Sequence, residues 1–140
     1  KFTTPSGKAQ FVSSKLSKIE LPPGRLLMTT IRSHDQFNTT VYGFDDRYRG
    51  IDGSRHVIFM NERNIADLGL KAGQNVDITS YFDDGQRHAS GFTIVPYEIP
   101  VDCCATYFPE ANPLVPLGSI AARSGTPTSK CIVVSLRAAT

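Results

Sequence analysis

The side chains best suited to ligand binding follow the apolar run that ends at Ile31. From Thr29 to Thr40 the chain carries Arg, His, Asp, Gln and Asn side chains with several hydroxyls, and Phe37 is the one apolar residue beyond Ile31. Such a mixture at the end of a strand can grip a polar ligand, because loops on a rigid scaffold often carry binding residues. The same composition also suits a solvated surface loop rich in turn formers. The composition of this segment alone does not distinguish a ligand-binding loop from a solvated loop.

Length and composition indicate one modest domain. The chain has 140 residues, 40% of them hydrophobic, which is enough to bury a core. Its formal charge of +2 comes from 15 basic and 13 acidic residues scattered along the sequence, so we expect no nucleic-acid partner. No apolar run approaches the roughly 20 residues that cross a bilayer, so we expect no membrane partner. The start at Lys1-Phe2 suggests a piece of a longer polypeptide.

The three cysteines, Cys103, Cys104 and Cys131, cannot all pair, and none lies in a Cys-x-x-Cys motif near a histidine. Metal binding by these residues is therefore not expected. Each is expected to be a small buried hydrophobe in a reducing compartment. The alternative, a reactive thiol, lacks close basic neighbours that would lower its pKa.

Five segments have strand patterns. The runs Leu26-Leu27-Met28 and Val57-Ile58-Phe59-Met60 predict central strands buried on both faces. Residues 75–79 and 92–94 alternate on either side of Asp83-Asp84-Gly85, which predicts a β-hairpin. The run from Cys131 to Leu136 predicts another interior strand. Residues 13–24 and 43–55 are expected to be long polar connections, the second of them a lid, a contact to another domain or simply a mobile loop.

The sequence predicts one helix, from Glu62 to Leu68. Asn61 suits the N-cap, Glu62 suits the positive end of the helix dipole, and Gly69 supplies a left-handed residue after the last turn. Leu70 then lies where it can contact Ile65 in a Schellman closure. So short a helix has to dock on the sheet to be stable.

Several short motifs occur in a recognisable order. They are Thr3-Thr4-Pro5-Ser6-Gly7-Lys8, the polar segment 32–40, Ala66-Asp67-Leu68-Gly69-Leu70-Lys71-Ala72-Gly73, Asn112-Pro113-Leu114, and Ser124-Gly125-Thr126-Pro127 followed by Lys130. In this order they resemble the C-terminal dinucleotide-binding domain of molybdopterin oxidoreductases, over almost the whole chain. Segments 32–40 and 107–112 are similar to a formate-dehydrogenase-like, cytoplasmic branch of that family.

The resemblance implies a mainly β fold. The expected architecture is a double-psi β-barrel of six strands with a few short helices, as in aspartate-decarboxylase-like and formate dehydrogenase C-terminal domains. Residues 1–24 would be an N-terminal arm and connection from the preceding domain. Residues 25–140 would form the dinucleotide-binding barrel.

The resemblance also implies a role in holding a cofactor. The cofactor would be molybdopterin guanine dinucleotide, in the bis form, with Mo or W held by another domain. The partners would be the remaining domains of the same catalytic subunit, in the cytoplasm, and none of the residues in this chain would be catalytic. Substrate and electron-transfer partner do not follow from it.

The resemblance assigns cofactor contacts to eight polar residues and Phe37, in the segment 30–39 and near the C-terminus. They are Thr30, Arg32, His34, Gln36, Phe37, Asn38, Thr39, Asn112 and Lys130. Arg32 would meet pyrophosphate or pterin oxygens, and Lys130 would neutralise a phosphate as a point charge.

Individual assignments keep alternatives. Asn38, Thr39 and Gln36 fall where related chains carry His, Thr and another His, so their exact contacts are open. His34 would donate to phosphate or ribose, or would simply be solvated. Asn112 would lie near the pterin, or would be a turn residue before proline.

Two other functions fit the same barrel. A protein-interaction domain like the N-terminal domain of AAA ATPases shares the Gly-Leu-x-x-Gly element, but lacks the match from Asn112 to Lys130. An aspartate-decarboxylase-like enzyme would need a self-processing Gly-Ser, and none is convincingly placed.

Overall fold

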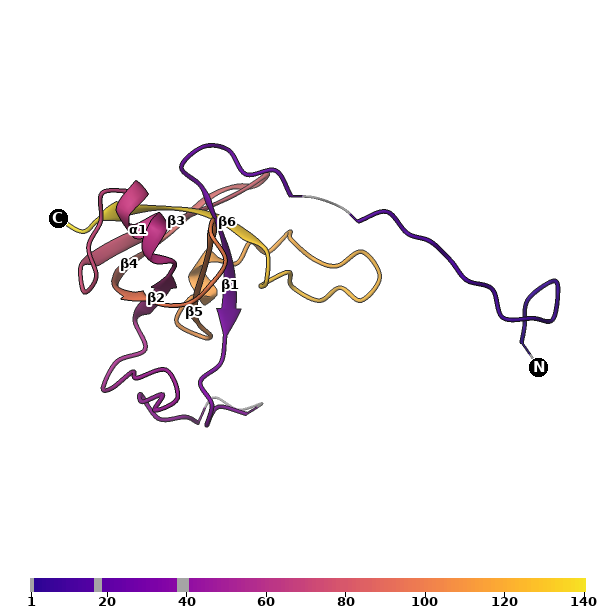
Figure 1. Cartoon of the computed structure of the whole chain (residues 1–140), viewed down its shortest axis with the longest axis horizontal. Coiled ribbons are helices and arrows are strands. Elements are labelled where there is room, and N and C mark those ends of the chain that lie inside the picture. Colours follow the sequence, from indigo (N-terminus) through magenta and orange to yellow (C-terminus); the bar gives the residue numbers. More distant parts are fainter. Residues whose placement is uncertain (1, 17–18, 38–40) are drawn as a thin grey trace.

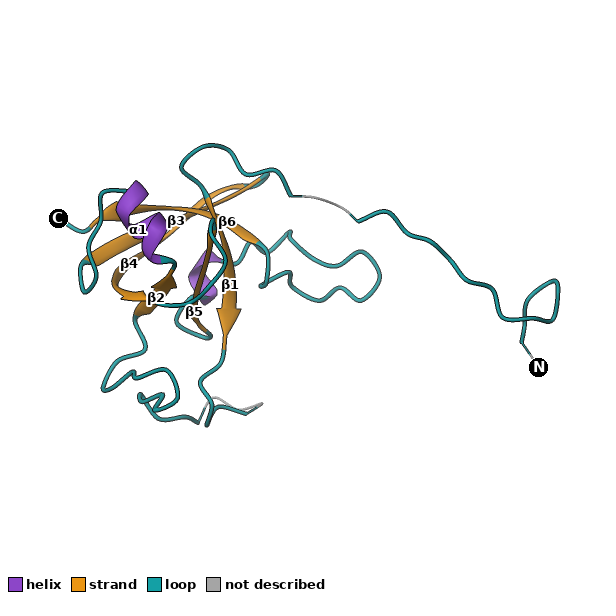
Figure 2. Ribbon diagram, viewed as in Figure 1, coloured by secondary structure: helices purple, strands orange, loops and turns teal. Residues whose placement is uncertain are grey.

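The barrel is the centre of the structure, a computed structural model that describes residues 2–16, 19–37 and 41–140. In these ranges six strands form a closed barrel: β1 (Leu26–Ile31), β2 (Val57–Met60), β3 (Asn75–Phe82), β4 (Gly85–Pro96), β5 (Cys103–Tyr107) and β6 (Ile132–Ala138). One α-helix, α1 (Glu62–Asp67), and one 3-10 helix, η1 (Asn112–Leu114), complete the fold (Figures 1 and 2). The predicted mainly β, double-psi type of barrel is confirmed.

The strand order around the barrel is β1-β5-β2-β4-β3-β6. Strand β1 pairs in parallel with β5, Leu27 lying opposite Cys103 and Ile31 opposite Tyr107. Strands β2 and β4 are also parallel, and the remaining pairs are antiparallel. Because β1 and β5 run in the same direction, their C-terminal ends meet at the same end of the barrel. The start of β6 lies there too, since β6 runs antiparallel to β1.

Strands β1 and β2 differ in burial. All four residues of β2 are buried, as predicted. Strand β1 alternates, with Leu26, Met28 and Thr30 buried and Leu27 only partly buried. The prediction that β1 is buried on both faces is therefore wrong. The outer side of β2 is covered because Phe59 packs in a second apolar cluster with Ile51, Val57, Ala105 and Tyr107.

The predicted hairpin is present and longer than expected. Strands β3 and β4 pair from Phe82–Gly85 back to Asn75–Thr93, with an irregularity between Val76 and Ile78. Strand β5 was not predicted, because Cys103-Cys104-Ala105-Thr106-Tyr107 has neither alternation nor β-branched enrichment.

The cysteines separate into three environments. Cys104 is buried and Cys103 partly buried, but Cys131 is exposed, so its predicted burial is wrong. Cys131 precedes β6 and lies in alternation with Val133 on the outer side, whereas Ile132 and Val134 enter the core.

Helix α1 has the predicted caps. The side chain of Asn61 accepts a hydrogen bond from the Arg63 N–H, and Gly69 has φ 66°. The Leu70 N–H donates to the Ile65 carbonyl at 2.9 Å, and the Gly69 N–H donates to Ala66, as in a Schellman motif. The helix ends at Asp67, one residue earlier than predicted, because Leu68 is the C-cap. Ile65 is buried and Leu68 packs on the core.

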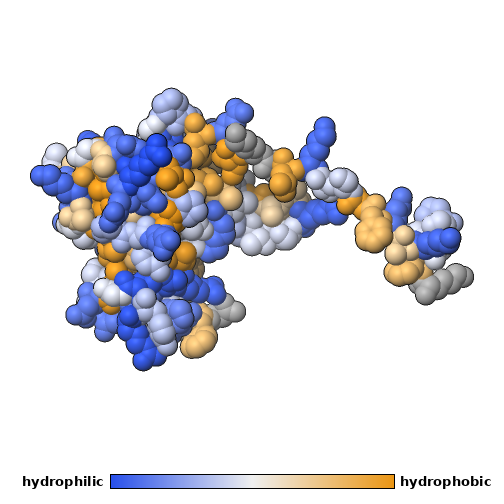
Figure 3. Space-filling view, viewed as in Figure 1, coloured by the Kyte–Doolittle hydropathy of each residue, from blue (hydrophilic) through white to orange (hydrophobic). Residues whose placement is uncertain are grey.

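Two segments project from the barrel. The N-terminal arm runs away from it as an extended chain, and the loop between η1 and β6 projects toward the same side (Figure 1). Apolar side chains are visible along the arm among polar ones (Figure 3). Phe11, Val12 and Leu16 of the arm are almost fully exposed, as is Leu117 of the loop. Among the described residues, no helix is long and apolar enough to cross a bilayer.

Candidate functional site

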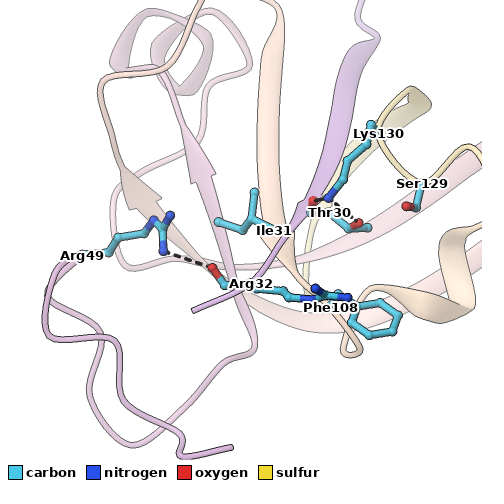
Figure 4. A pocket seen from close by; sticks show the side chains of 7 residues that line it. All are labelled: Thr30, Ile31, Arg32, Arg49, Phe108, Ser129 and Lys130. Atoms are coloured by element: carbon cyan, nitrogen blue, oxygen red, sulfur yellow. Dashed lines mark hydrogen bonds between the residues drawn. The ribbon is translucent and has the colours of Figure 1, made fainter. Parts of the chain in front are cut away.

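A pocket of about 510 Å³ opens where β1 and β5 end and β6 begins (Figure 4). It is lined by Thr30, Ile31, Arg32, Arg49, Phe108, Ser129 and Lys130. The topology explains why these residues meet. Thr30 to Arg32 end β1, Phe108 directly follows β5, and Ser129-Lys130 precede β6, while Arg49 comes from the connection between β1 and β2.

Lys130 ties the turn before β6 to the end of β1. Its ammonium donates to the Thr30 carbonyl and lies 3.4 Å from the Thr30 hydroxyl. The Thr30 N–H in turn donates to the Ser129 carbonyl at 2.9 Å. Burial, and then the nearby charge of Arg32, lower the pKa of Lys130 below its usual value. The ammonium is thus less well solvated than on an open surface, and an anion in the pocket would favour its charged form.

Arg49 is held by a buried carboxylate. Its Nη1 lies 2.5 Å from Oδ2 of Asp46 and also donates to the Arg32 carbonyl at 3.2 Å. The Tyr107 hydroxyl donates to the same Asp46 oxygen at 2.8 Å. Burial would raise the pKa of Asp46, but the hydrogen bonds from Tyr107 and Arg49 outweigh it and lower that pKa. Asp46 is therefore a carboxylate that fixes Arg49 at the pocket.

Arg32 and Phe108 form another wall of the pocket. The guanidinium carbon of Arg32 lies 5.9 Å from the centre of the Phe108 ring (Figure 4). The pocket thus combines three cationic side chains, Arg32, Arg49 and Lys130, with hydroxyl groups and one aromatic ring. Such a donor set suits a ligand with phosphates and a flat ring system.

Arg55 lies behind the pocket in a buried polar cluster. Its side chain is 1% exposed and forms an ion pair with Glu110, Nε lying 2.8 Å from Oε1. It also donates to the Ser33 hydroxyl at 2.6 Å, the Gln36 amide oxygen at 2.7 Å and the Phe108 carbonyl at 2.8 Å. Burial of so many polar groups together indicates a satisfied network rather than a ligand-facing surface.

The structure brings together three of the predicted contacts. Thr30, Arg32 and Lys130 all line the pocket. Gln36 is buried behind it, where its amide nitrogen donates to the Phe108 carbonyl at 2.9 Å. Asn38 and Thr39 lie outside the described residues.

Three further predicted contacts are not in the pocket lining. His34 is exposed and its ring stacks on Tyr48 with centroids 3.8 Å apart. Phe37 is exposed. Asn112 is exposed at the start of η1, where its N–H donates to the Pro109 carbonyl at 2.8 Å. Their roles as contacts stay predictions.

Sequence reasoning missed Arg49 and Arg55. Both belong to the segment 43–55, which was interpreted as a polar connection. The segment contains a small antiparallel bridge between Asp46 and Ile51, and both of these residues are buried. A local signal was Ile51, the one aliphatic residue of this segment.

The described residues hold no group of three or more His, Cys, Asp or Glu side chains that could bind a metal ion. Cys104 lies in the core, where burial and the neighbouring Cys103 raise the pKa of its thiol well above the usual range. This thiol stays protonated at neutral pH.

Comparison with known proteins gives consistent matches. The family described as the molydopterin dinucleotide binding domain matches residues 26–132. The chain is 51% identical over 140 residues to an uncharacterized oxidoreductase of Mycobacterium tuberculosis strain H37Rv, covering 96% of this chain and 18% of that protein. It is 40% identical over 143 residues to Protein YdeP of Escherichia coli strain K12, covering 97% of this chain and 19% of that protein. The chain thus spans less than a fifth of the length of these relatives.

Proposed function

The chain belongs to the molybdopterin dinucleotide-binding domain family, and from this premise we propose that its pocket grips a molybdopterin guanine dinucleotide within a larger oxidoreductase. The observation that carries the proposal is the meeting of Arg32, Arg49 and Lys130 in one pocket. These residues are far apart in the sequence. The end of β1, the connection between β1 and β2, and the turn before β6 each contribute one of them.

The donor set of the pocket fits the chemistry of the proposed ligand. Arg32, Arg49 and Lys130 would hold the diphosphate, because guanidinium and ammonium groups bind phosphate oxygens through charge-assisted hydrogen bonds. The hydroxyl groups of Thr30 and Ser129 suit phosphate or ribose oxygens. Phe108 would contact a flat ring of the cofactor.

The role of this chain is binding and orientation. When bound, the cofactor supplies the electron-transfer chemistry through its metal. The residues here hold the dinucleotide and exclude water from one side of it. Gln36, whose amide is bonded to Phe108 and Arg55, acts from behind the pocket.

Finer features of the function are also part of the proposal. We place the chain in a formate-dehydrogenase-like, cytoplasmic branch, with the bis form of the cofactor and with Mo or W held by another domain. The support is the similarity of segments 32–40 and 107–112 to that branch. Reduction of an artificial electron acceptor by formate, measured with a full-length relative of this chain, tests the branch.

The proposed partners are the remaining domains of the same catalytic subunit. Phe11, Val12 and Leu16 of the arm and Leu117 of the loop are exposed apolar side chains on segments that project the same way. Exposed apolar side chains of this kind suit contacts with other domains. The relatives are several times longer than the chain, so such domains are available in them.

Titration of the 140-residue chain with guanosine diphosphate, followed by NMR chemical shifts, tests the cofactor site. We expect weak binding, because the other walls of the site are absent. The shifts should gather around residues 30–32, 49, 108 and 129–130. Arg32→Ala and Arg49→Ala should each weaken binding, since a lost charge-assisted contact costs about 1.5–3 kcal/mol.

Arg63→Ala is the matched control, because Arg63 is an exposed arginine on α1 paired with Asp67. It should bind guanosine diphosphate like the unchanged chain. A chain that shows no shifts at high ligand concentration would refute the site. That result would favour the protein-interaction alternative.

A further inference from the structure

We propose that Arg55 positions the cationic side chains of the pocket, acting from behind it as a buried clamp between the two ends of the site. This inference rests on the proposed function, since it concerns the geometry of the same ligand site. Arg55 does not line the pocket and would not touch the ligand. It would act through the residues that it holds.

The Arg55 guanidinium is surrounded by hydrogen-bond acceptors and by two aromatic rings. Around its edge lie Glu110, Ser33, Gln36 and the Phe108 carbonyl, with donor–acceptor distances of 2.6 to 2.8 Å. Two aromatic rings lie near it, the centre of Tyr42 at 4.2 Å and that of Tyr107 at 4.4 Å from its central carbon. Few degrees of freedom remain to a group held in this way.

Two hydrogen bonds of Arg55 reach the pocket or a residue next to it. Ser33 directly follows Arg32, so its hydrogen bond to Arg55 sets where the chain leaves β1. The Phe108 carbonyl belongs to a residue that lines the pocket. One buried cation therefore connects the end of β1 to the segment after β5.

The connection extends to Arg49 through Tyr107. The ring of Tyr107 lies beside Arg55, and its hydroxyl donates to Asp46, the carboxylate that holds Arg49. Burial, followed by the bond to Asp46, raises the pKa of the Tyr107 hydroxyl, so it remains a donor at all ordinary pH values. The positions of Arg32, Phe108 and Arg49 thus all depend on the position of Arg55.

The charges of the clamp and of the pocket are separate. Arg55 is paired with Glu110 and does not line the pocket, so its cation is not directed at the ligand. A lysine would keep the charge but not the planar fork that reaches several acceptors at fixed angles. Arg55→Lys therefore tests geometry with the charge preserved.

The test compares the 140-residue chain with Arg55→Lys and with Gln36→Leu, which removes one partner of the clamp at similar volume. The probe is guanosine diphosphate, with affinities measured by NMR at a temperature where circular dichroism shows each variant folded. We expect Arg55→Lys to weaken binding about tenfold, because a displaced Arg32 or Arg49 would lose one charge-assisted contact to the ligand. Gln36→Leu should weaken binding in the same direction.

A second readout separates positioning from mere stability. In the unchanged chain, the side-chain N–H signals of Arg32 and Arg49 should shift when guanosine diphosphate binds. In folded Arg55→Lys these signals should broaden or lose the shift. Arg63→Lys, which alters an exposed ion pair on α1, should leave both the affinity and these signals unchanged.

The outcomes are distinguishable. If folded Arg55→Lys and Gln36→Leu bind the probe like the unchanged chain, the clamp is purely structural and the inference is wrong, while the cofactor site stands. If Arg55→Lys does not fold, the affinity of folded Gln36→Leu decides alone: unchanged affinity contradicts the inference, and weaker binding supports it. If the unchanged chain does not bind the probe, the proposed site and the clamp fall together.

Discussion

At the scale of single residues, the cations of the pocket are supported in two ways. Arg49 is bonded to a buried carboxylate, Asp46, and so has a fixed direction. Lys130 is bonded to the Thr30 carbonyl, which carries no net charge. The arginine therefore offers a directed contact, and the lysine offers a positive charge whose state depends on pH.

The first prediction concerns the pH dependence of ligand binding. Because burial and Arg32 lower the pKa of Lys130, its ammonium loses its proton at a lower pH than an ordinary lysine. The charged form binds a phosphate, so affinity is full below this pKa and falls as the pH rises through it. Lys130→Arg stays charged throughout, so the affinity ratio of the variant to the unchanged chain should rise with pH. Calorimetric titration with guanosine diphosphate from pH 7 to 10 measures this ratio, in which the titration of the ligand cancels. A ratio independent of pH would contradict the proposed contact between Lys130 and a phosphate.

The second prediction concerns stability in acid. The pKa of Asp46 is lowered in the folded chain, so its charge stabilises the fold above the unfolded pKa of about 4. That stabilisation is lost as the pH falls through the lower, folded value. Asp46→Asn should therefore reduce the free energy of unfolding at pH 7 by about 1.5–3 kcal/mol. The difference in the free energy of unfolding between the variant and the unchanged chain should shrink below about pH 4. Urea unfolding of the variant and the unchanged chain at pH 7 and below pH 4 measures this difference. The control is Asp67→Asn, which removes an exposed ion pair and should have little effect on stability at either pH.

At the scale of elements, local sequence signals predicted some helices and strands and missed others. Helix α1 was predicted to within one residue, because its caps are encoded by Asn61 and Gly69 inside the same short segment. Strand β5 was missed, because what makes Cys103 to Tyr107 a strand is pairing with β1 and β2 far away in the sequence. Contacts that require distant partners leave little trace in local composition.

The third prediction tests the cap of α1. Gly69 has φ 66°, and a Cβ at this position would meet nothing within 4 Å, so a substitution costs only backbone strain. Gly69→Val should lower the free energy of unfolding by about 1–2 kcal/mol, because a β-branched residue is penalised at positive φ. Gly69→Asn should lower the free energy of unfolding by less, because Asn tolerates the left-handed region. Chemical denaturation of both variants gives the comparison, and equal losses would show that something other than φ matters.

At the scale of the whole molecule, the site is a product of topology. Arg32 and Lys130 were predicted through the family resemblance, and the barrel does bring them to one pocket. Arg49 and Arg55 were not, because their roles depend on buried partners that the fold supplies: Asp46 and Tyr107 for one, Glu110 and Gln36 for the other. A loop rich in Asp, Arg and Gly gives the same local signal whether its charges are solvated or buried.

The division of the chain into an arm and a barrel stays a prediction, and it leads to the fourth test. In the described part of the arm, nearly every residue from 2 to 16 is exposed, so removing residues 1–24 should take little buried surface from the barrel. The denaturant dependence of unfolding scales with the surface exposed on unfolding. The shortened chain, beginning at Arg25, should therefore unfold with the same denaturant slope and the same free energy as the full chain, within error.

The arm should matter when the rest of the protein is present. Phe11, Val12 and Leu16 are proposed to pack on the remaining domains, and burial of such side chains yields about 1.5–3 kcal/mol each. Replacing all three by Ser in a full-length relative, at the matching positions, should loosen the barrel domain and make it easier to remove by limited proteolysis. The same triple substitution in the 140-residue chain should leave its unfolding unchanged. Loss of stability in the short chain would show instead that the arm packs on its own barrel.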